Sequence, residues 1–225
     1  MSKKNGMKAV VICLLAAMIA GLFTGCLHEH NWMDATCYSP MTCLGCGETI
    51  GEPRGHIWNE AACDVGRQCD DCGKTEGEAL GHDFVGGDAF TPAMCSRCDA
   101  MQPLALPESG QVFLGRDMNY VSQLSVTAAA LQSSYVKLKG TSGEDVFSFF
   151  VRAGETVTVD VPGGYFYVYF AYGTDWYGTE YLFGPNTTYS KDDELTDFEN
   201  YTWEYTLTPV TDGNFSETPI DADEF

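Results

Sequence analysis

The chain has 225 residues, of which 12 are Lys or Arg and 32 are Asp or Glu, giving a formal net charge of -20. Hydrophobic residues make up 44% and aromatic residues 13%, which is enough for a packed core and excludes wholesale disorder. Nucleic-acid binding depends on basic side chains that neutralise phosphates. A chain with this excess of acidic residues is therefore not expected to bind DNA or RNA. The length admits one large domain or two small ones.

Residues 1–25 are predicted to be a lipoprotein signal peptide. Three Lys precede an apolar stretch over residues 9–23, which is too short for a comfortable membrane span. The end of this stretch, Leu22 to Cys26, resembles the lipobox of bacterial lipoproteins, although Phe23 stands where Leu, Val or Ile is usual. The resemblance implies that the Cys26 thiol is lipidated and anchors an extracytoplasmic protein to the bacterial cell membrane. An ordinary secretory signal is the alternative.

The composition changes along the rest of the chain. Every Cys lies at or before Cys98, whereas 11 of the 12 Tyr lie at or after Tyr120. A short proline-marked segment, 103–107, separates the two parts. We therefore expect a Cys/His region over residues 26–102, a linker over 103–107 and a differently stabilised domain over 108–225.

The Cys/His region contains an internal repeat of 26 residues. The repeated Cys and His residues recur 26 positions apart in four series, three of them with three residues and one with two. They are His30, His56 and His82; Cys43, Cys69 and Cys95; Cys46, Cys72 and Cys98; and Cys37 with Cys63. The third copy has Ala89 in place of its first Cys. An aromatic residue follows each His by two positions, as Trp32, Trp58 and Phe84.

This spacing predicts structural zinc sites. Two thiolates separated by two residues can approach one tetrahedral ion from a tight turn, and the Gly after the second Cys lets the chain leave with a positive φ. One more Cys and one His complete the Cys₃His set of structural zinc, which leaves no position for a catalytic water. A module of 26 residues is too small to form a sufficient hydrophobic core by itself, so a bound metal would supply the free energy needed for folding.

Spacing leaves two ligand arrangements open. If each His serves the cysteines after it, the complete sets are His30, Cys37, Cys43 and Cys46, then His56, Cys63, Cys69 and Cys72. If it serves those before it, the sets are Cys37, Cys43, Cys46 and His56, then Cys63, Cys69, Cys72 and His82. The first arrangement leaves His82, Cys95 and Cys98 one ligand short, and the second leaves Cys95 and Cys98 over.

Disulfides are the alternative to zinc, because an exported chain meets an oxidising environment and the repeats hold an even number of cysteines. Each complete copy has three cysteines, however, which cannot all pair within the copy. The evenly spaced histidines would also have no role in a disulfide framework. Zinc is therefore favoured. A redox relay is less favoured still, since no thioredoxin-like pattern surrounds the Cys-x₂-Cys pairs.

Residues 108–225 are predicted to form an antiparallel β-sandwich of about seven short strands. Alternating or continuous apolar runs separated by glycine-rich turns are typical of such a fold. The clearest runs are Tyr135–Lys139, Val146–Val151, Thr156–Val161, Gly164–Tyr172 and Trp203–Val210, and residues 124–131 could form a strand or a short helix. The whole chain is thus expected to be mainly β, with small zinc-ribbon-like repeats followed by the sandwich.

An aromatic loop in the sandwich offers a possible ligand-binding surface. Trp176 and Tyr177 could stack against sugar rings, although Tyr and Trp also suit half-buried strands. Every His lies at or before His82, so the sandwich has no His base beside a nucleophile, and no glycine-rich phosphate loop is present. We expect no enzymatic activity.

Two parts of the chain resemble a known group of proteins. The tract from Cys37 to His56, repeated closely from Cys63 to His82, resembles the Cys/His repeats of uncharacterised surface lipoproteins of Gram-positive gut bacteria. The tract 148–157, with 174–178 and 182–184, resembles their companion β-sandwich-like domain. The resemblance implies a membrane-tethered, zinc-containing protein without an assigned activity. Binding or assembly in the cell envelope is the expected role, with another envelope protein or a cell-wall glycan as partner; zinc capture and transfer is the alternative.

Overall fold

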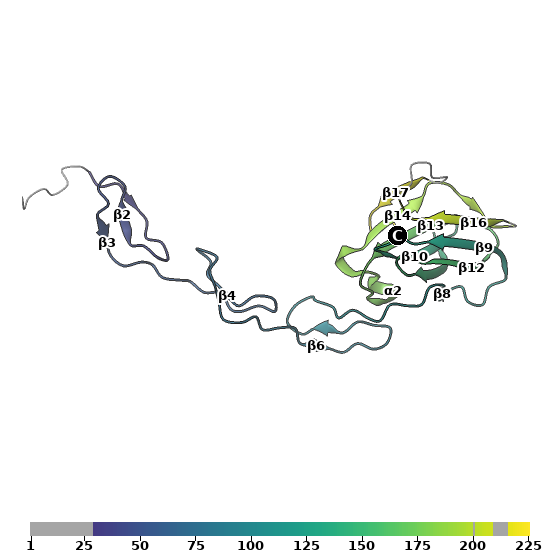
Figure 1. Cartoon of the computed structure of the whole chain (residues 1–225), viewed down its shortest axis with the longest axis horizontal. Helices are drawn as coiled ribbons and strands as arrows, with labels where there is room; N and C mark the ends of the chain where they lie inside the picture. The colour runs from purple at the N-terminus through teal and green to yellow at the C-terminus, as the bar shows by residue number, and fades with distance from the viewer. Residues whose placement is uncertain (1–28, 200, 209–215) are drawn as a thin grey trace, which may run out of the picture. The chain divides into compact units, whose positions relative to one another are not determined.

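The structure is a computed structural model that describes residues 29–199, 201–208 and 216–225. The predicted signal peptide and Cys26 lie outside the described residues. The chain divides into two compact units between Gly81 and His82 (Figure 1). Among the described residues, no helix is both long enough and apolar enough to cross a membrane.

The N-terminal unit contains two small sheets. β1 (Trp32–Met33), β2 (Met41–Cys43) and β3 (Thr49–Ile50) form a three-stranded sheet in that order, and β4 (Arg67–Gln68) pairs with β5 (Thr75–Glu76). All pairings in these two sheets are antiparallel. The strands are short because the turn after each Cys-x₂-Cys reverses the chain, with φ of 76° at Gly47 and 71° at Gly73.

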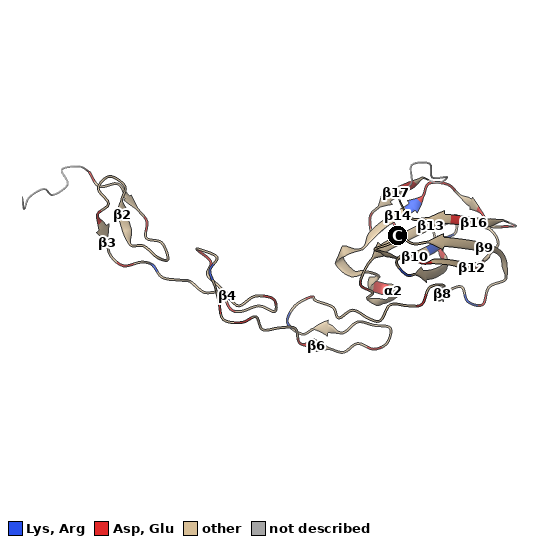
Figure 2. Ribbon diagram, viewed as in Figure 1, with Lys and Arg blue, Asp and Glu red and all other residues tan. Residues whose placement is uncertain are grey.

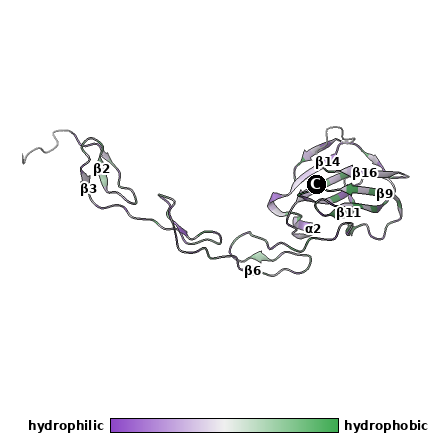
Figure 3. Cartoon of the chain, in the orientation of Figure 1, coloured by the Kyte–Doolittle hydropathy of each residue, from purple (hydrophilic) through white to green (hydrophobic). Residues whose placement is uncertain are grey.

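Cysteines take the place of an apolar core in the N-terminal unit. Among its described residues, the buried hydrophobic side chains are Cys37, Cys43, Cys63 and Cys69. Larger apolar side chains are exposed instead, including Leu44 at 65% and Tyr38 at 60%. Figure 3 accordingly shows the strongest hydrophobic colouring on the other unit, for example on β9 and β11. Burial of apolar area therefore contributes little to the stability of this unit.

The C-terminal unit begins with the third copy of the repeat, in which β6 (Phe84–Val85) pairs with β7 (Met94–Cys95). The change in composition predicts a linker at residues 103–107. In the structure, the third copy and residues 103–107 belong to the same compact unit as the β domain. The backbone N–H of Leu104 donates to the Trp176 carbonyl at 2.7 Å, and Leu104 packs against a buried aromatic cluster.

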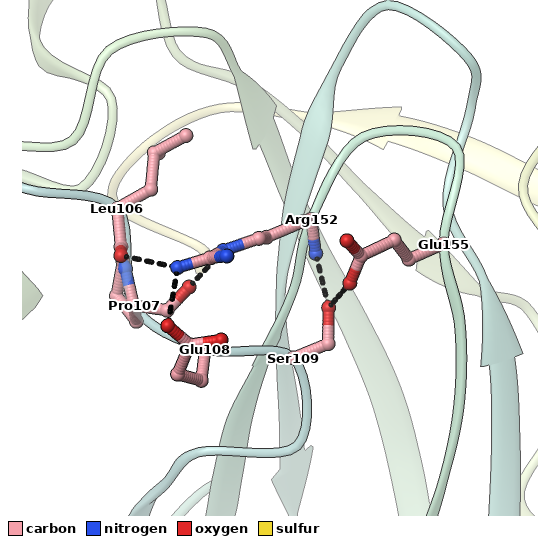
Figure 4. Close-up of polar contacts among 6 residues, drawn as sticks. All are labelled: Leu106, Pro107, Glu108, Ser109, Arg152 and Glu155. Atoms are coloured by element: carbon pink, nitrogen blue, oxygen red, sulfur yellow. Dashed lines mark hydrogen bonds and ion pairs between the residues drawn. The ribbon is translucent and has the colours of Figure 1, made fainter.

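Arg152 holds the same segment at its other end. Its guanidinium donates to the carbonyls of Leu106 and Pro107 at 3.0 and 2.7 Å and to the Glu108 carboxylate at 2.8 Å (Figure 4). The Ser109 hydroxyl accepts from the Arg152 backbone N–H at 2.9 Å. Residues 104–109 are therefore fixed to the β domain by main-chain and side-chain bonds.

Two sheets form the β domain. The larger has the order β17-β14-β13-β10-β11-β8, with β15 also pairing with β13, and the smaller has the order β12-β9-β16. Their elements are β8 (Val112–Leu114), β9 (Tyr120–Thr127), β10 (Ser133–Lys139), β11 (Asp145–Val151), β12 (Thr156–Pro162), β13 (Tyr165–Gly173), α2 (Gly178–Tyr181), the 3₁₀ turn η1 (Gly184–Asn186), β14 (Thr188–Asp192), β15 (Thr196–Asp197), β16 (Thr202–Thr206) and β17 (Glu217–Ile220).

The main core lies between these sheets. Inward residues of the smaller sheet, such as Leu124, Val126 and Val161, share one buried cluster with Phe147 and Phe149 of the larger sheet. The prediction of a mainly β fold with Cys/His clusters near the N-terminus is confirmed. One pairing differs from the expected antiparallel arrangement, because β16 runs parallel to β9.

Acidic residues are distributed over both units, as Figure 2 shows. A few basic residues are placed on the larger sheet, where Lys137 and Lys139 on β10 lie 3.0 and 3.9 Å from the Asp145 carboxylate. Lys137 also lies 4.2 Å from the centre of the Phe225 ring. These pairings offset part of the local charge without forming a basic patch.

Candidate metal centres

The three Cys-x₂-Cys turns share one backbone hydrogen bond, from the N–H of the first Cys to the carbonyl five residues later. In the first copy the Cys43 N–H donates to the Glu48 carbonyl at 2.8 Å, and the Gly47 N–H donates to the Cys43 carbonyl at 2.9 Å. The Gly45 N–H points at the Cys43 sulfur, 3.4 Å away. N–H groups aimed at sulfur stabilise the thiolate form, which is the form that binds metal.

The same turn recurs in the other copies. The N–H of Cys69 donates to the Lys74 carbonyl, and that of Cys95 to the Ala100 carbonyl, both at 2.8 Å. Each His is placed by the aromatic residue two positions later, with ring centres 4.9 to 5.3 Å apart. The pairs are His30 with Trp32, His56 with Trp58 and His82 with Phe84. One local structure is therefore built three times.

The complete ligand set of the N-terminal unit joins two copies. The ligand atoms of Cys37, His56, Cys69 and Cys72 all lie within 4.8 Å of one another. Cys37 belongs to the first copy, whereas the His and the Cys-x₂-Cys pair belong to the second. Neither of the two arrangements drawn from spacing has this combination, because in both of them Cys37 shares a site with Cys43 and Cys46.

The distances in this set fit a tetrahedral ion. With Zn–S near 2.3 Å and Zn–N near 2.0 to 2.1 Å, tetrahedral angles put two sulfurs about 3.8 Å apart and a sulfur and a nitrogen about 3.6 Å apart. The sulfurs of Cys37 and Cys69 are 3.6 Å apart, and the Cys72 sulfur is 3.4 Å from Nδ1 of His56. The four ligand atoms are thus close enough together to hold one tetrahedral metal ion.

The thiols of this set differ in their readiness to ionise. Burial and hydrogen bonds with Cys69 and Cys72 raise the pKa of Cys37 to about 12. Burial also opposes ionisation of Cys69, but hydrogen bonds from the Cys72 backbone and the His56 side chain outweigh it and lower its pKa to about 6. A cation that binds all three sulfurs would remove the mutual repulsion of their thiolates.

Tyr38 covers one side of the same set. Its ring meets His56 edge-on with centres 4.9 Å apart, and its hydroxyl lies 3.8 Å from the Cys72 sulfur. The hydrogen bond with Cys72, together with burial, raises the pKa of Tyr38. The phenol therefore stays protonated beside the Cys72 sulfur.

The first copy holds a set of three ligands. Those of His30, Cys43 and Cys46 lie within 4.8 Å of one another, and Nδ1 of His30 is 3.7 Å from the Cys46 sulfur. On the far side of the ring, Nε2 of His30 is 3.6 Å from a Glu48 carboxylate oxygen. A carboxylate at this position is the usual outer partner of a metal-bound His.

The third copy places His82, Cys95 and Cys98 in the same way. The Cys98 sulfur is 3.4 Å from Nδ1 of His82. Hydrogen bonds from the Arg97 backbone outweigh burial and lower the pKa of Cys95 to about 5. Cys63, in the N-terminal unit, is buried, and its carbonyl accepts from the Gly81 N–H at 3.0 Å. Among the described residues, none of the eight cysteines of the repeats forms a disulfide.

The two aromatic residues considered for ligand binding have structural positions. Trp176 is 4% exposed and packs against Phe150 and Phe183, with ring centres 5.1 and 5.6 Å away. The half-buried Tyr177 lies against Gly184, where an added Cβ would come 2.8 Å from its ring. Burial in this second core leaves Trp176 without an open face for stacking on a sugar.

A cavity near Trp176 is lined by residues of the third copy and the β domain. Its volume is about 310 Å³, and its lining includes Phe90, Glu108, Gln111 and Phe113.

No family model matches the chain, and no curated protein or solved structure matches it either. Inference about function therefore rests on the ligand sets and on the fold that carries them.

Proposed function

We propose that the Cys/His repeats are structural zinc modules in which each ion joins two consecutive copies. One copy supplies its first Cys, and the next supplies the His and the Cys-x₂-Cys pair. The observation that supports this is the grouping of Cys37 with His56, Cys69 and Cys72 at tetrahedral distances. Zinc bound there would replace the apolar core that this unit lacks.

The repeat extends the proposal to the second joint. Cys63 stands 26 residues after Cys37, so on the repeat alone we assign it as the fourth ligand of the set His82, Cys95 and Cys98. Ala89 stands at the corresponding position of the third copy. A thiol there would have no set to complete, because the sequence after Cys98 contains no further Cys or His.

A structural role is favoured over a catalytic or carrier role for the four-ligand set. Four protein ligands leave the ion no position for water or substrate, and Cys37 and Cys69 are buried at 6% and 0% exposure. We propose that the protein is a non-catalytic surface lipoprotein, anchored through Cys26, whose zinc modules carry the β domain for binding or assembly in the bacterial cell envelope.

Metal analysis with chelation tests the structural role. The full-length chain, purified reduced in detergent, should contain zinc, and removal by a strong chelator should make the repeat region sensitive to protease while the β domain stays resistant. The variant Cys69→Ser, Cys72→Ser should be sensitive before chelation, whereas the control Ser39→Ala should behave as the unchanged protein. A metal-free, disulfide-linked chain that ignores the chelator would refute the proposal.

Lipid attachment has a separate test. Fatty-acid labelling in a bacterial host should mark the unchanged protein and Cys13→Ser but not Cys26→Ser, because Cys26 is the proposed acceptor. Equal labelling of Cys26→Ser would remove the lipoprotein part of the proposal and leave the zinc part intact.

A further inference from the structure

A hollow lies on the outer face of the larger sheet of the β domain. Alternate residues of β10 belong to the main core, so Tyr135 and Lys137 point to the opposite face of the sheet. The hollow has a volume of about 460 Å³, which is within the range of small-molecule sites. Its lining includes Tyr135, Lys137, Ser148 of β11, Glu180 of α2 and Phe225. Regular elements of the β domain therefore build its floor and one wall.

The floor of the hollow carries a fixed hydroxyl. Ser148, which is directly opposite Lys137 in the pairing of β10 with β11, is 1% exposed. Its oxygen accepts a hydrogen bond from the Tyr135 hydroxyl at 2.8 Å. Burial raises the pKa of Tyr135, so the phenol stays protonated and remains the donor. The Ser148 hydroxyl keeps its own hydrogen to donate.

A charged pair lies beside this hydroxyl. The Lys137 ammonium is 3.0 Å from the Asp145 carboxylate, which also lines the hollow, and it donates to the backbone oxygen of Phe225 at 3.0 Å. An ammonium has three donors and a carboxylate accepts about four hydrogen bonds, so both groups retain capacity beyond these contacts. An apolar occupant would remove water from the pair without replacing its hydrogen bonds, which costs free energy. The occupant should therefore carry several donors and acceptors.

Charge and apolar lining narrow the class of occupant further. Asp145 and Glu180 outnumber Lys137, so an anion would meet a net negative lining on an acidic chain. Leu182 and Phe225 supply an apolar part of the lining. Sugars combine these requirements, because each hydroxyl both donates and accepts while the ring C–H groups form apolar patches. The lining thus fits a neutral saccharide better than an anion or a hydrocarbon.

We propose that this hollow binds a neutral saccharide. Asp145 and Glu180 accept hydrogen bonds from its hydroxyls, Lys137 and Ser148 donate to them, and Phe225 packs against its ring C–H groups. The inference rests on the proposed binding role of the β domain, and it names the class of ligand. It is separate from the sugar-stacking role expected for Trp176, which is buried in the neighbouring aromatic cluster.

Nuclear magnetic resonance of the full-length chain, reduced and zinc-loaded in detergent, can locate the binding. The neutral probes are triacetylchitotriose, cellotriose and maltotriose, and trigalacturonic acid is the anionic probe. A neutral probe should shift the amide signals of residues 145–148, 179–182 and 222–225 in a saturable way. The exposed Tyr165 lies outside the lining, so its signal should stay in place. The anionic probe should bind more weakly than the neutral ones.

Variants of the lining test the assigned roles. Asp145→Asn should weaken binding of the responsive neutral probe about 10-fold, because a charged acceptor is lost. The matched control is Asp160→Asn, on an exposed carboxylate of β12, which should leave the affinity unchanged. Glu180→Ala alters an exposed side chain of α2, so the domain should stay folded while the affinity falls several-fold. Urea titration of each variant verifies that the fold is retained.

Several results would overturn the saccharide site. They are signals that ignore all three neutral probes, shifts confined to other residues, tighter binding of the anionic probe, and unchanged affinity in both Asp145→Asn and Glu180→Ala. Zinc is measured in the same samples, which separates this inference from the proposed modules. A chain that holds zinc but binds no neutral probe would refute the saccharide site alone, whereas a metal-free chain that binds a probe would refute the zinc modules alone.

Discussion

Substituting Cys37 distinguishes the observed ligand set from the arrangements that spacing alone suggests. In the structure Cys37 lies 3.6 Å from the Cys69 sulfur, and the two belong to one set. In both spacing-based arrangements, Cys37 and Cys69 serve different ions. Cys37→Ser and Cys69→Ser should therefore release the same ion, and the double variant should lose no more metal than either single variant.

The size of the effect follows from the number of ligands. Structural zinc sites bind with an apparent free energy of about 10–16 kcal/mol at neutral pH, or about 3–4 kcal/mol for each of four ligands. Water or the Ser hydroxyl would recover part of that, which leaves a loss of about 2–3 kcal/mol. Each 1.4 kcal/mol is a factor of ten, so the affinity should fall about 30- to 150-fold.

Native mass spectrometry can count the ions at a chelator concentration where the unchanged chain keeps zinc in both four-ligand sets. Cys37→Ser, Cys69→Ser and their combination should each lose one ion. The combination of Cys37→Ser with Cys95→Ser should lose two, because Cys95 belongs to the other proposed joint. Loss of two ions from the Cys37, Cys69 double variant would refute the shared set and restore one of the arrangements based on spacing.

Three further predictions concern the C-terminal unit. Arg152→Ala should lower its free energy of unfolding by about 1–3 kcal/mol in urea titrations, because three hydrogen bonds to residues 106–108 are lost, whereas Arg116→Ala should cost about 0.5 kcal/mol or less. Trp176→Ala should cost about 3–5 kcal/mol by the same method, and the 52% exposed Tyr165→Ala far less; equal costs would contradict the buried position of Trp176. Burial and a hydrogen bond to a carboxylate raise the pKa of Tyr205, so its contribution to stability is complete below about pH 10 and is lost as the pH rises further. Tyr205→Phe should make the alkaline decline less steep, and an unchanged slope would exclude this cause.

Strands with strict alternation could be predicted from the sequence because the pattern itself defines the buried face. The expected strand Thr156–Val161 corresponds to β12 (Thr156–Pro162), in which Val159 and Val161 face the core while Asp160 is exposed. Residues 124–131 were open to either a strand or a helix, and the structure places Leu124 to Thr127 in β9 (Tyr120–Thr127). Local pattern was insufficient there because β9 pairs with β16, which is distant in sequence.

Some structural features depend on tertiary packing and could not be predicted from sequence patterns. Trp176 follows a polar loop and looks available for binding, yet the side chains of β10 and β11 form an apolar surface that it covers. The parallel pairing of β16 with β9 depends on a long connection whose course has no local signal. In the repeats, the spacing predicted that Cys and His side chains would form groups, and the structure contains such groups. The grouping of Cys37 depends instead on how the chain folds back after His56.

The end of the repeat array carried a signal for that assignment. If every ion were held within one copy, each complete copy would need all four ligands and the third copy would simply be defective. If each ion joins a first Cys to the following His and Cys-x₂-Cys pair, the last copy needs no first Cys. Ala89, in the last copy, fits this second rule. An array of three copies then has two joints between copies, and among the described residues His30, Cys43 and Cys46 of the first copy form a separate group.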